Sequence, residues 1–309
     1  MVEFLTAWLA MVPVFATPFL LASLGLILSE RAGVVSLGAE GYLATGAMVA
    51  AAAVILGGAH PFLALAAGAG AAAVQALGFG IVVVLFRADQ VLAGLATVAL
   101  GLGFTGLVGR GFVHETFAGL EPIELAPWSA LPLVGPFLFR QDPLAWGAVG
   151  LALGCWWLLR HTGLGLRLRA VGEDPATADL SGVSVQGLRL AAVAAGGALC
   201  GLGGAYLSVA VSNVWVEGMV SGRGWIALAL VIFARWDPLR AIAGAMLFGG
   251  VEALLPRLQA AGVDLPVYLT AMLPYLLTIL VLVLVSLRPG RSSGEPAALG
   301  LPYVRQDRH

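Results

Sequence analysis

The amino-acid sequence predicts an all-α, polytopic membrane protein with about eight or nine transmembrane helices. Its 309 residues are 60% hydrophobic and only 11% charged, and the mean hydropathy is +0.97. A soluble globular domain carries roughly 25% charged residues, so this composition indicates a membrane protein. Several apolar runs also reach the roughly 20 residues that a helix needs to cross a hydrocarbon core of about 30 Å. Because hydrocarbon offers the backbone no hydrogen-bond partners, the spans are expected to be helices.

Nine apolar runs define the expected elements in chain order. They cover residues 6–28, 33–57, 61–86, 91–108, 143–159, 188–209, 225–234, 239–255 and 267–287. Glycine and alanine fill several of them, as in AAGAGAAAVQALGFG (66–80), and small residues let membrane helices approach closely. We therefore expect a single transmembrane domain over residues 1–287, followed by a cytoplasmic tail over residues 288–309.

The basic residues set the expected orientation in the membrane. All sixteen are arginine, and the chain has no lysine. Threading the runs alternately through the bilayer leaves four arginines on one side, at Arg110, Arg140, Arg223 and Arg257. The other side receives twelve: Arg31, Arg87, Arg160, Arg167, Arg169, Arg189, Arg235, Arg240, Arg288, Arg291, Arg305 and Arg308. By the positive-inside rule the richer side is cytoplasmic, so the N-terminus is expected outside and the C-terminus inside.

The absence of lysine excludes two classes of chemistry. A phosphate-binding GxxxxGK[ST] loop and a Schiff base both require that amine, so the chain itself is not expected to hydrolyse ATP. Cys155 and Cys200 lie within apolar runs, and the four histidines are scattered without ligand-like spacing. We therefore expect no catalytic residues, no metal site and no nucleic-acid partner, and membrane lipid as the surroundings.

Two stretches of the chain resemble each other. GVVSLGAEGYLA (33–44) and GMVSGRGWIALA (218–229) have identical residues at five corresponding positions, and both are interrupted by glycine. The threading runs them in opposite directions through the membrane. This pattern predicts an inverted repeat, with a first copy over about 33–160 and a second over about 188–287. The run 225–234 would cover only about 15 Å, so discontinuous helices are expected in both copies.

Broken helices in corresponding positions point to a solute pathway near the midplane of the membrane. The polar or stacking groups expected to face it are Ser36, Glu40, Ser221, Arg223 and Trp225. Two alternatives stay open: Glu40 could cap a half-helix or pair with an arginine, and Arg223 could reach the outer headgroups. Glu217, Glu252 and Asp264 are expected at the membrane borders.

A polar stretch, RAVGEDPATADLSG (169–182), separates two long apolar runs. Asp174 suits the N-cap of a helix, Pro175 its first turn, and Gly182 a left-handed residue at its end. The stretch therefore predicts a short cytoplasmic helix over 175–181. Contact with another protein is its expected use, and a plain surface loop is the alternative.

Several segments together resemble a known family. They are ERAGVVSLGAEGYLATGA (30–47), the segment 165–209 that includes GEDPATADLSG, EGMVSGRGWIALALVIFARWDPLRA (217–241), MLPYLLTILVLV (272–283) and AALGLPY (297–303). In this order they resemble the shorter permease subunit of bacterial ABC importers for purine nucleosides and related simple-sugar solutes. The resemblance covers nearly the whole chain and implies a transmembrane subunit in the bacterial inner membrane that is not itself an enzyme.

The resemblance also implies a coupling helix at about 174–182 that docks in a groove of the ATPase. Its implied residues are Glu173, Asp174, Pro175, Ala176, Ala178 and Gly182. The implied partners are a second, longer permease subunit that forms a heterodimer with this chain, an ATP-binding subunit with two nucleotide-binding halves, and an extracytoplasmic solute-binding lipoprotein. ATP and Mg would be bound by the ATPase, so no cofactor is expected in this chain.

The transported solute is expected to be neutral and polar, because the predicted pathway holds few charges. A nucleoside is favoured by the resemblance, and a simple sugar or riboflavin are alternatives. A different class, an ion-coupled secondary transporter, would need an intramembrane carboxylate, for which Glu40 is the candidate.

Overall fold

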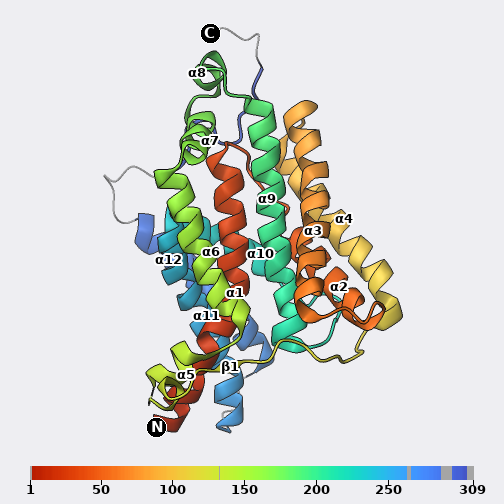
Figure 1. The fold of residues 1–309 in the computed structure, drawn as a ribbon, viewed down its shortest axis with the longest axis vertical. Coiled ribbons are helices and arrows are strands. Elements are labelled where there is room, and N and C mark those ends of the chain that lie inside the picture. The colour runs from red at the N-terminus through yellow and green to blue at the C-terminus, as the bar shows by residue number, and fades with distance from the viewer. Residues whose placement is uncertain (1, 132, 263–265, 287–293, 305–309) are drawn as a thin grey trace.

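In the described part of the chain, each of the nine apolar runs carries a helix (Figure 1). The computed structural model describes residues 2–131, 133–262, 266–286 and 294–304. The helices are α1 (Val2–Arg31), α2 (Ala39–Ile55), α3 (Pro61–Gly80), α4 (Gln90–Val108), α6 (Pro143–His161), α9 (Val185–Tyr206), α10 (Arg223–Ala234), α11 (Pro238–Ala260) and α12 (Val267–Ser286).

Among the described residues, five stretches are long and apolar enough to cross a membrane: Glu3–Arg31, Pro61–Leu85, Gln90–Phe112, Val185–Ser212 and Pro238–Ala260. Two of them end in a π-helical turn, η1 (Ile81–Leu85) after α3 and η4 (Leu207–Ser212) after α9. The prediction of an all-α, polytopic membrane protein is therefore confirmed.

The two shortest of the nine helices on the apolar runs do not reach the length of a full crossing. Helix α2 has 17 residues and α10 has 12. At 1.5 Å per residue they cover about 26 Å and about 18 Å, less than the roughly 30 Å of the hydrocarbon core. Non-helical backbone precedes each of them, over residues 32–38 and 213–222. The predicted breaks thus fall in the glycine-containing stretches that raised the expectation.

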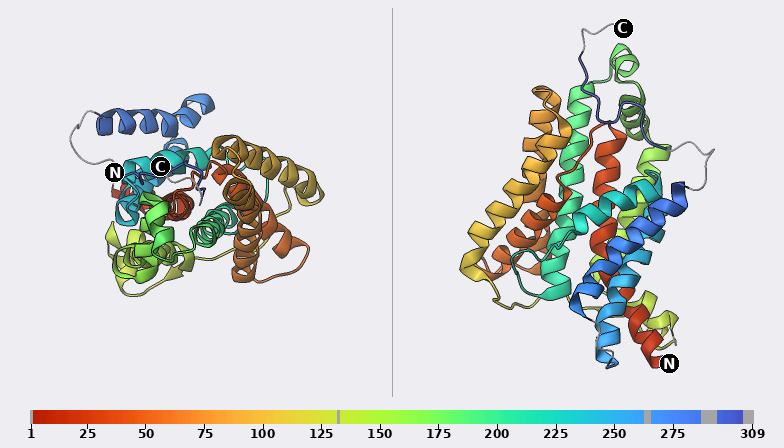
Figure 2. Two further views of the ribbon diagram at one scale, coloured as in Figure 1. Left: turned by 90° about the horizontal axis from the view of Figure 1, so that it is seen from above. Right: turned by 180° about the vertical axis from the view of Figure 1, so that it is seen from behind.

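Helix α1 runs through the middle of the bundle, where α9, α11, α10 and α6 pack around it (Figures 1 and 2). On one side, α2, α3 and α9 approach so closely that their backbones meet. A Cβ atom built at Gly46 of α2 would lie 2.1 Å from the carbonyl oxygen of Gly201 in α9. Only glycine permits this approach, which explains the glycine content of these runs.

Short elements connect α4 to α6 at one end of the bundle. They are η2 (Gly109–Phe112), β1 (Ile123–Glu124), η3 (Trp128–Ala130), α5 (Val134–Phe139) and β2 (Arg140–Gln141). The two strands pair antiparallel, with Ile123 opposite Gln141. Within the described residues, the regular structure is therefore helical apart from this one two-residue ribbon.

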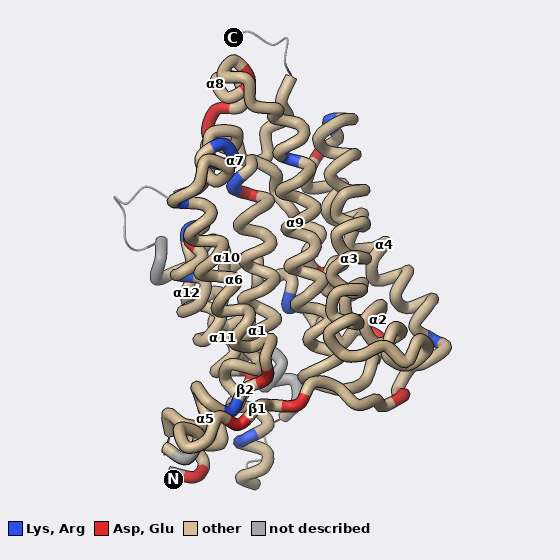
Figure 3. Tube along the Cα trace, in the orientation of Figure 1, with Lys and Arg blue, Asp and Glu red and all other residues tan. Residues whose placement is uncertain are grey.

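Two water-facing helices, α7 (Gly163–Glu173) and α8 (Pro175–Leu180), project from the opposite end, which we call the α8 end (Figure 1). The charged residues gather mainly at the two ends of the bundle (Figure 3). Arginines assigned to the richer side occupy α7 and the ends or starts of α1, α6, α9 and α11. Arg288, Arg291, Arg305 and Arg308 lie outside the described residues.

The described part of the tail, 294–304, returns to the bundle at the α8 end. The backbone amide of Ala298 donates to the carbonyl of Gly172 at 2.9 Å. Arg189 of α9 ties two segments together, because it donates to the carbonyl oxygens of Ala32 and Leu301, each at 3.1 Å. The tail is thus packed against both α7 and the turn that follows α1, whereas the N-terminal end of α1 lies at the far end (Figure 1).

Candidate functional site

The starts of the two short helices meet inside the bundle. Glu40, in the first turn of α2, accepts hydrogen bonds from the backbone amides at the start of α10: Oε1 from Gly222 at 2.6 Å and Oε2 from Gly224 at 2.7 Å. Its residue is only 6% exposed. Those amides are among the donors that an α-helix leaves unsatisfied at its N-terminus, and a carboxylate there is stabilised by the helix dipole. We call this contact the α2–α10 junction.

Glycine makes the α2–α10 junction possible. Gly222 has a φ of 83°, and a Cβ atom on it would fall 1.9 Å from the hydroxyl of Tyr275. A Cβ atom on Gly224 would lie 2.4 Å from the backbone nitrogen of Glu40. A side chain at Gly224 would push α2 and α10 apart, and one at Gly222 would be strained by the positive φ and would meet Tyr275. The SGRG sequence is therefore explained by a left-handed turn and by a close approach.

A partly buried ion pair lies beside the junction. Arg223 Nη2 and Glu252 Oε2 are 3.1 Å apart, with side chains 17% and 13% exposed. Arg223 Nη1 also donates to the carbonyls of Met219 and Val220, at 2.9 Å and 3.2 Å. The guanidinium therefore holds the turn before α10 against the middle of α11.

The ion pair lines a cavity of 320 Å³ that also receives Ser221 and Tyr275. The Tyr275 hydroxyl donates to the carbonyl of Ser221 at 3.1 Å, and the Ser221 hydroxyl donates to the carbonyl of Gly218 at 2.9 Å. The cavity thus combines a charged pair, two hydroxyls and apolar walls. This mixture suits a neutral, polar, hydrogen-bonding molecule.

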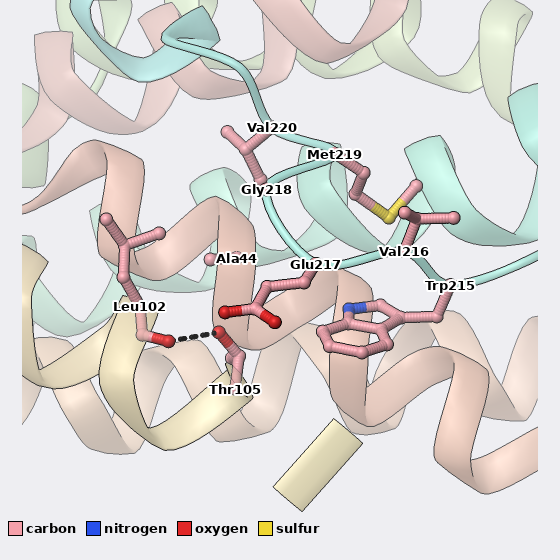
Figure 4. Close-up of a pocket in the computed structure, with 9 residues that line it drawn as sticks. All are labelled: Ala44, Leu102, Thr105, Trp215, Val216, Glu217, Gly218, Met219 and Val220. Atoms are coloured by element: carbon pink, nitrogen blue, oxygen red, sulfur yellow. Dashed lines mark hydrogen bonds between the residues drawn. The ribbon is translucent and has the colours of Figure 1, made fainter. Parts of the chain in front are cut away.

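A smaller cavity of 180 Å³ is lined by the turn that leads into α10, residues 215–220, and by α2 and α4 (Figure 4). In Figure 4 the carboxylate of Glu217 and the hydroxyl of Thr105 point toward one another across it. The turn before α10 therefore has a cavity on each side of it, and a movement of this turn would change both.

The five residues predicted to face the pathway occupy different surroundings. Glu40, Ser221 and Arg223 come together at or beside the α2–α10 junction. Ser36 is only 2% exposed, Trp225 is 39% exposed, and neither lines the two cavities described above. Glu40 caps a half-helix, which was the alternative left open, and Arg223 pairs with an acid.

The partner of Glu252 was not predicted from the sequence. Glu252 lies in the C-terminal half of α11 and pairs with Arg223. Its expected place at a membrane border stays a prediction. A single glutamate in an apolar run was the available signal, since an intramembrane acid needs a partner. Asp264 lies outside the described residues.

Helix α8 confirms the local predictions for the polar stretch. Asp174 is its N-cap, and Oδ1 accepts from the amides of Ala176 and Thr177 at 3.0 Å each. Hydrogen bonds from Thr177, first from its hydroxyl, lower the pKa of the Asp174 carboxyl. The cap is therefore ionised at neutral pH, and its contribution would be lost only as the pH falls through that lowered pKa. Pro175 occupies the first turn, and Gly182 ends the helix with a φ of 82°.

The side chains around α8 divide into an inner and an outer set. Ala178 is 4% exposed and packs with Val171 and Val185, while Ala176 is exposed. Glu173 Oε2 accepts from the amide of Ala297 in the tail at 3.2 Å. These inner contacts fix α8 to the rest of the α8 end.

Sequence reasoning overlooked Leu180, the last residue of α8. Its side chain is 88% exposed, the highest value among the large apolar residues that the structure describes. A leucine surrounded by polar residues in ATADLSG was the available signal. We call this exposed leucine side chain the apolar knob of α8. Its position at the end of a water-facing helix suits insertion into a groove of a partner protein.

The Arg223–Glu252 pair yields a stability prediction. Replacing Arg223 with methionine leaves a buried carboxylate unpaired, and we expect the free energy of unfolding to fall by about 3 kcal/mol. Replacing both residues with methionine should restore most of that loss. Thermal unfolding of the purified chain in detergent measures both, and a double variant less stable than Arg223→Met would contradict the pairing.

Among the described residues, no three His, Cys, Asp or Glu side chains cluster as metal ligands.

Comparison with known proteins identifies the family. Residues 9–282 match the family described as branched-chain amino acid transport system, permease component. The chain is 33% identical over 308 residues to the guanosine ABC transporter permease protein NupQ of Bacillus subtilis, covering 96% of this chain and 95% of that one. It is 32% identical over 307 residues to the nucleoside ABC transporter permease protein NupC of Lactococcus lactis, covering 94% and 95%.

A third relative is named as a sugar transporter subunit. The putative glucose ABC transporter permease protein TsgC13 of Haloferax volcanii is 40% identical over 257 residues, covering 81% of this chain and 77% of that one. The helical bundle, the membrane-length helices and these matches lead to one conclusion: the chain is a multi-pass membrane protein that belongs to this family of ABC transporter permeases.

Proposed function

We propose that this chain forms, with a second and longer permease subunit, the pathway of an ATP-driven importer for a nucleoside. The observation that carries the proposal is that one chain combines two broken helices meeting inside the bundle with a water-facing lever helix outside it. Broken helices near the midplane suit a solute pathway, and a rigid outer helix suits a subunit driven by a separate motor. The two relatives that match over more than nine tenths of the chain carry guanosine and nucleoside in their names.

The α2–α10 junction is the proposed gate. Glu40 holds α10 through two backbone amides, so the two short helices move together or separate at this point. In the inverted repeat proposed here, over 33–160 and 188–287, α2 and α10 are the corresponding half-helices. Ser36, Glu40, Ser221, Arg223 and Trp225 line the pathway in at least one of its two states.

A neutral solute agrees with the charges at the junction. Arg223 and Glu252 neutralise each other, and the Glu40 carboxylate is already occupied by two amides. The remaining hydroxyls of Ser221 and Tyr275 can hydrogen-bond a ribose or a base, while apolar walls pack on a purine ring. A simple sugar satisfies the same groups, and the sugar-named relative makes it the second candidate.

Helix α8 is the proposed contact with an ATP-binding subunit that has two nucleotide-binding halves. Glu173, Asp174, Pro175, Ala176, Ala178 and Gly182 shape this coupling helix, and Leu180 supplies the apolar knob that seats in the ATPase. An extracytoplasmic lipoprotein would deliver the solute at the other end. ATP and Mg are bound by the ATPase, and the conformational change reaches the pathway through α7 and α8.

Uptake of radiolabelled guanosine by cells that carry this chain and its partner subunits tests the proposal. We expect uptake that stops when ATP is depleted and persists when the ion gradients are collapsed. Excess unlabelled adenosine should compete, and glucose and riboflavin should not. Uptake that depends on an ion gradient and ignores ATP would instead indicate a secondary transporter.

Orientation in the membrane is predicted by the arginine split, with the α8 end in the cytoplasm. Cysteines at Gly163 and Gly111 are suitable reporters, because a Cβ atom at either position meets nothing within 4 Å. We expect a membrane-impermeant thiol reagent to label Gly163→Cys only from the cytoplasm and Gly111→Cys only from outside. Labelling of both from the same side would overturn the proposed threading.

A further inference from the structure

A polar cavity of 440 Å³ lies at the α8 end, away from the α2–α10 junction. Its walls come from the ends of α1 and α6, from α7 and from the corner between α10 and α11. The charged and aromatic side chains that line it include those of Arg31, Trp156, Arg160, His161, Arg169 and Asp237.

The cavity carries excess positive charge. Three arginines line it against one acid, and that acid is already engaged. Asp237 Oδ2 lies 2.8 Å from Arg160 Nη2, and Asp237 Oδ1 accepts from the amide of Leu239 at 2.9 Å. Arg31 and Arg169 line the cavity and form no ion pair with a carboxylate among the described residues. Arg31 Nε and Nη2 donate to the carbonyl oxygen of Trp236 at 3.1 Å and 3.0 Å, which holds the guanidinium in place.

Two residues that line the cavity each hold a buried donor without an acceptor in the described part of the chain. Arg169 Nε and Trp156 Nε1 are shielded from solvent, and neither has a hydrogen-bond partner among the described residues. The Trp156 ring is held in place, with the His161 ring 5.0 Å away and the Arg160 guanidinium 5.8 Å from its centroid. Buried donors are rarely left unpaired, so this pair of N–H groups indicates a missing acceptor.

The position of the cavity narrows the chemistry of that acceptor. It lies where α6 ends and α7 leaves the bundle, at an end where charged residues gather (Figure 3). An end of a membrane bundle that is rich in charge is expected at the level of the lipid headgroups. Tryptophan and arginine are favoured at this level, and basic pockets between membrane helices bind phosphate headgroups. A phosphate oxygen can accept from arginine and indole donors at once.

We propose that this cavity binds the phosphate group of an anionic ligand through Arg31, Arg160, Arg169 and the indole N–H of Trp156. The headgroup of an anionic phospholipid and free inorganic phosphate both provide that group. Either ligand would hold α7 against the ends of α1 and α6. Because α8 follows α7 directly, the position of α8 would be stabilised as well.

Native mass spectrometry of the full chain provides the test. The chain would be released from nanodiscs that contain phosphatidylglycerol and phosphatidylcholine, and the retained phosphatidylglycerol counted. We expect Arg169→Gln to lower retention about tenfold, as for the loss of one charge-assisted hydrogen bond. Trp156→Phe removes only the indole donor and should lower retention severalfold. Arg167→Gln, on the same helix but outside this cavity, is the matched control.

A second arm identifies the source of the phosphate. Binding of inorganic phosphate would be measured by calorimetry in nanodiscs of phosphatidylcholine alone. Phosphate binding that Arg169→Gln weakens, together with lipid retention that it leaves unchanged, would support the site and assign it to a soluble anion. Retention and phosphate binding that respond equally to Arg167→Gln and Arg169→Gln, or to neither, would overturn the proposal.

Discussion

Replacing Glu40 with glutamine is expected to abolish nucleoside uptake while the chain still inserts into the membrane. Each carboxylate oxygen of Glu40 accepts one backbone amide of α10, at 2.6 Å and 2.7 Å. Glutamine keeps the size of the side chain but turns an amide group toward one of these donors. A buried donor left without an acceptor costs about 1–3 kcal/mol, so the start of α10 should detach from α2. Initial uptake rates, normalised to the amount of inserted chain, measure the effect.

The control for this change is Glu121→Gln. Glu121 is an exposed glutamate in the connection between α4 and α6, so the same change of charge should leave uptake within about twofold of the unaltered chain, as for ordinary surface substitutions. Ser221→Ala provides a milder comparison, because the Ser221 hydroxyl bonds only to its own turn. Normal uptake by Glu40→Gln would show that the carboxylate is dispensable at the α2–α10 junction.

The second large effect is expected at α8. Gly182→Val forces a β-branched side chain into a left-handed conformation, at a cost of about 1–2 kcal/mol. Asp174→Ala removes the N-cap of this helix. Together they should distort both ends of the six-residue helix. We expect normal insertion and unchanged solute affinity of the binding lipoprotein, but the loss of both uptake and solute-stimulated ATP hydrolysis.

A gentler variant distinguishes docking from folding. Leu180→Ser removes the exposed knob without touching the contacts of α8, because the Leu180 side chain is 88% exposed. It should weaken co-purification of the ATPase and lower uptake with it. Gly163→Val, at the start of α7, is the matched control, since a Cβ atom there meets nothing within 4 Å. Full uptake by Leu180→Ser and by the Gly182→Val, Asp174→Ala double variant would leave α8 an ordinary surface helix.

The features that the sequence predicted correctly are local ones. The nine apolar runs, the breaks before α2 and α10, the Asp174 cap and the left-handed Gly182 each depend on residues within a few positions of one another. Hydrophobicity, glycine and capping chemistry act over that range, so a single sequence reports them. The short run at 225–234 likewise predicted a helix close to the 12 residues of α10.

Contacts between distant residues could not be predicted in the same way. Arg223 reaches Glu252 across 29 positions, and Glu40 reaches Gly222 across 182. Which acid meets which helix depends on how several glycine-rich and alanine-rich helices stack, and their sequences are nearly interchangeable. The tail illustrates the same limit, because the bond from Ala298 to Gly172 uses backbone groups, which carry no sequence signature.

In the mechanism proposed here, α8 controls access to the cavity beside the α2–α10 junction. Ser221 lines this cavity and is exposed, so a cysteine there reports on it. The native cysteines, Cys155 and Cys200, would first be replaced with alanine. The labelling rate of Ser221→Cys by an impermeant thiol reagent would then be measured from each side of proteoliposomes, with and without a non-hydrolysable ATP analogue bound to the assembled complex. We predict that the nucleotide analogue raises the labelling rate from one side and lowers it from the other, and that Gly182→Val removes both changes. Labelling rates that are the same with and without nucleotide in the unaltered complex would contradict this mechanism.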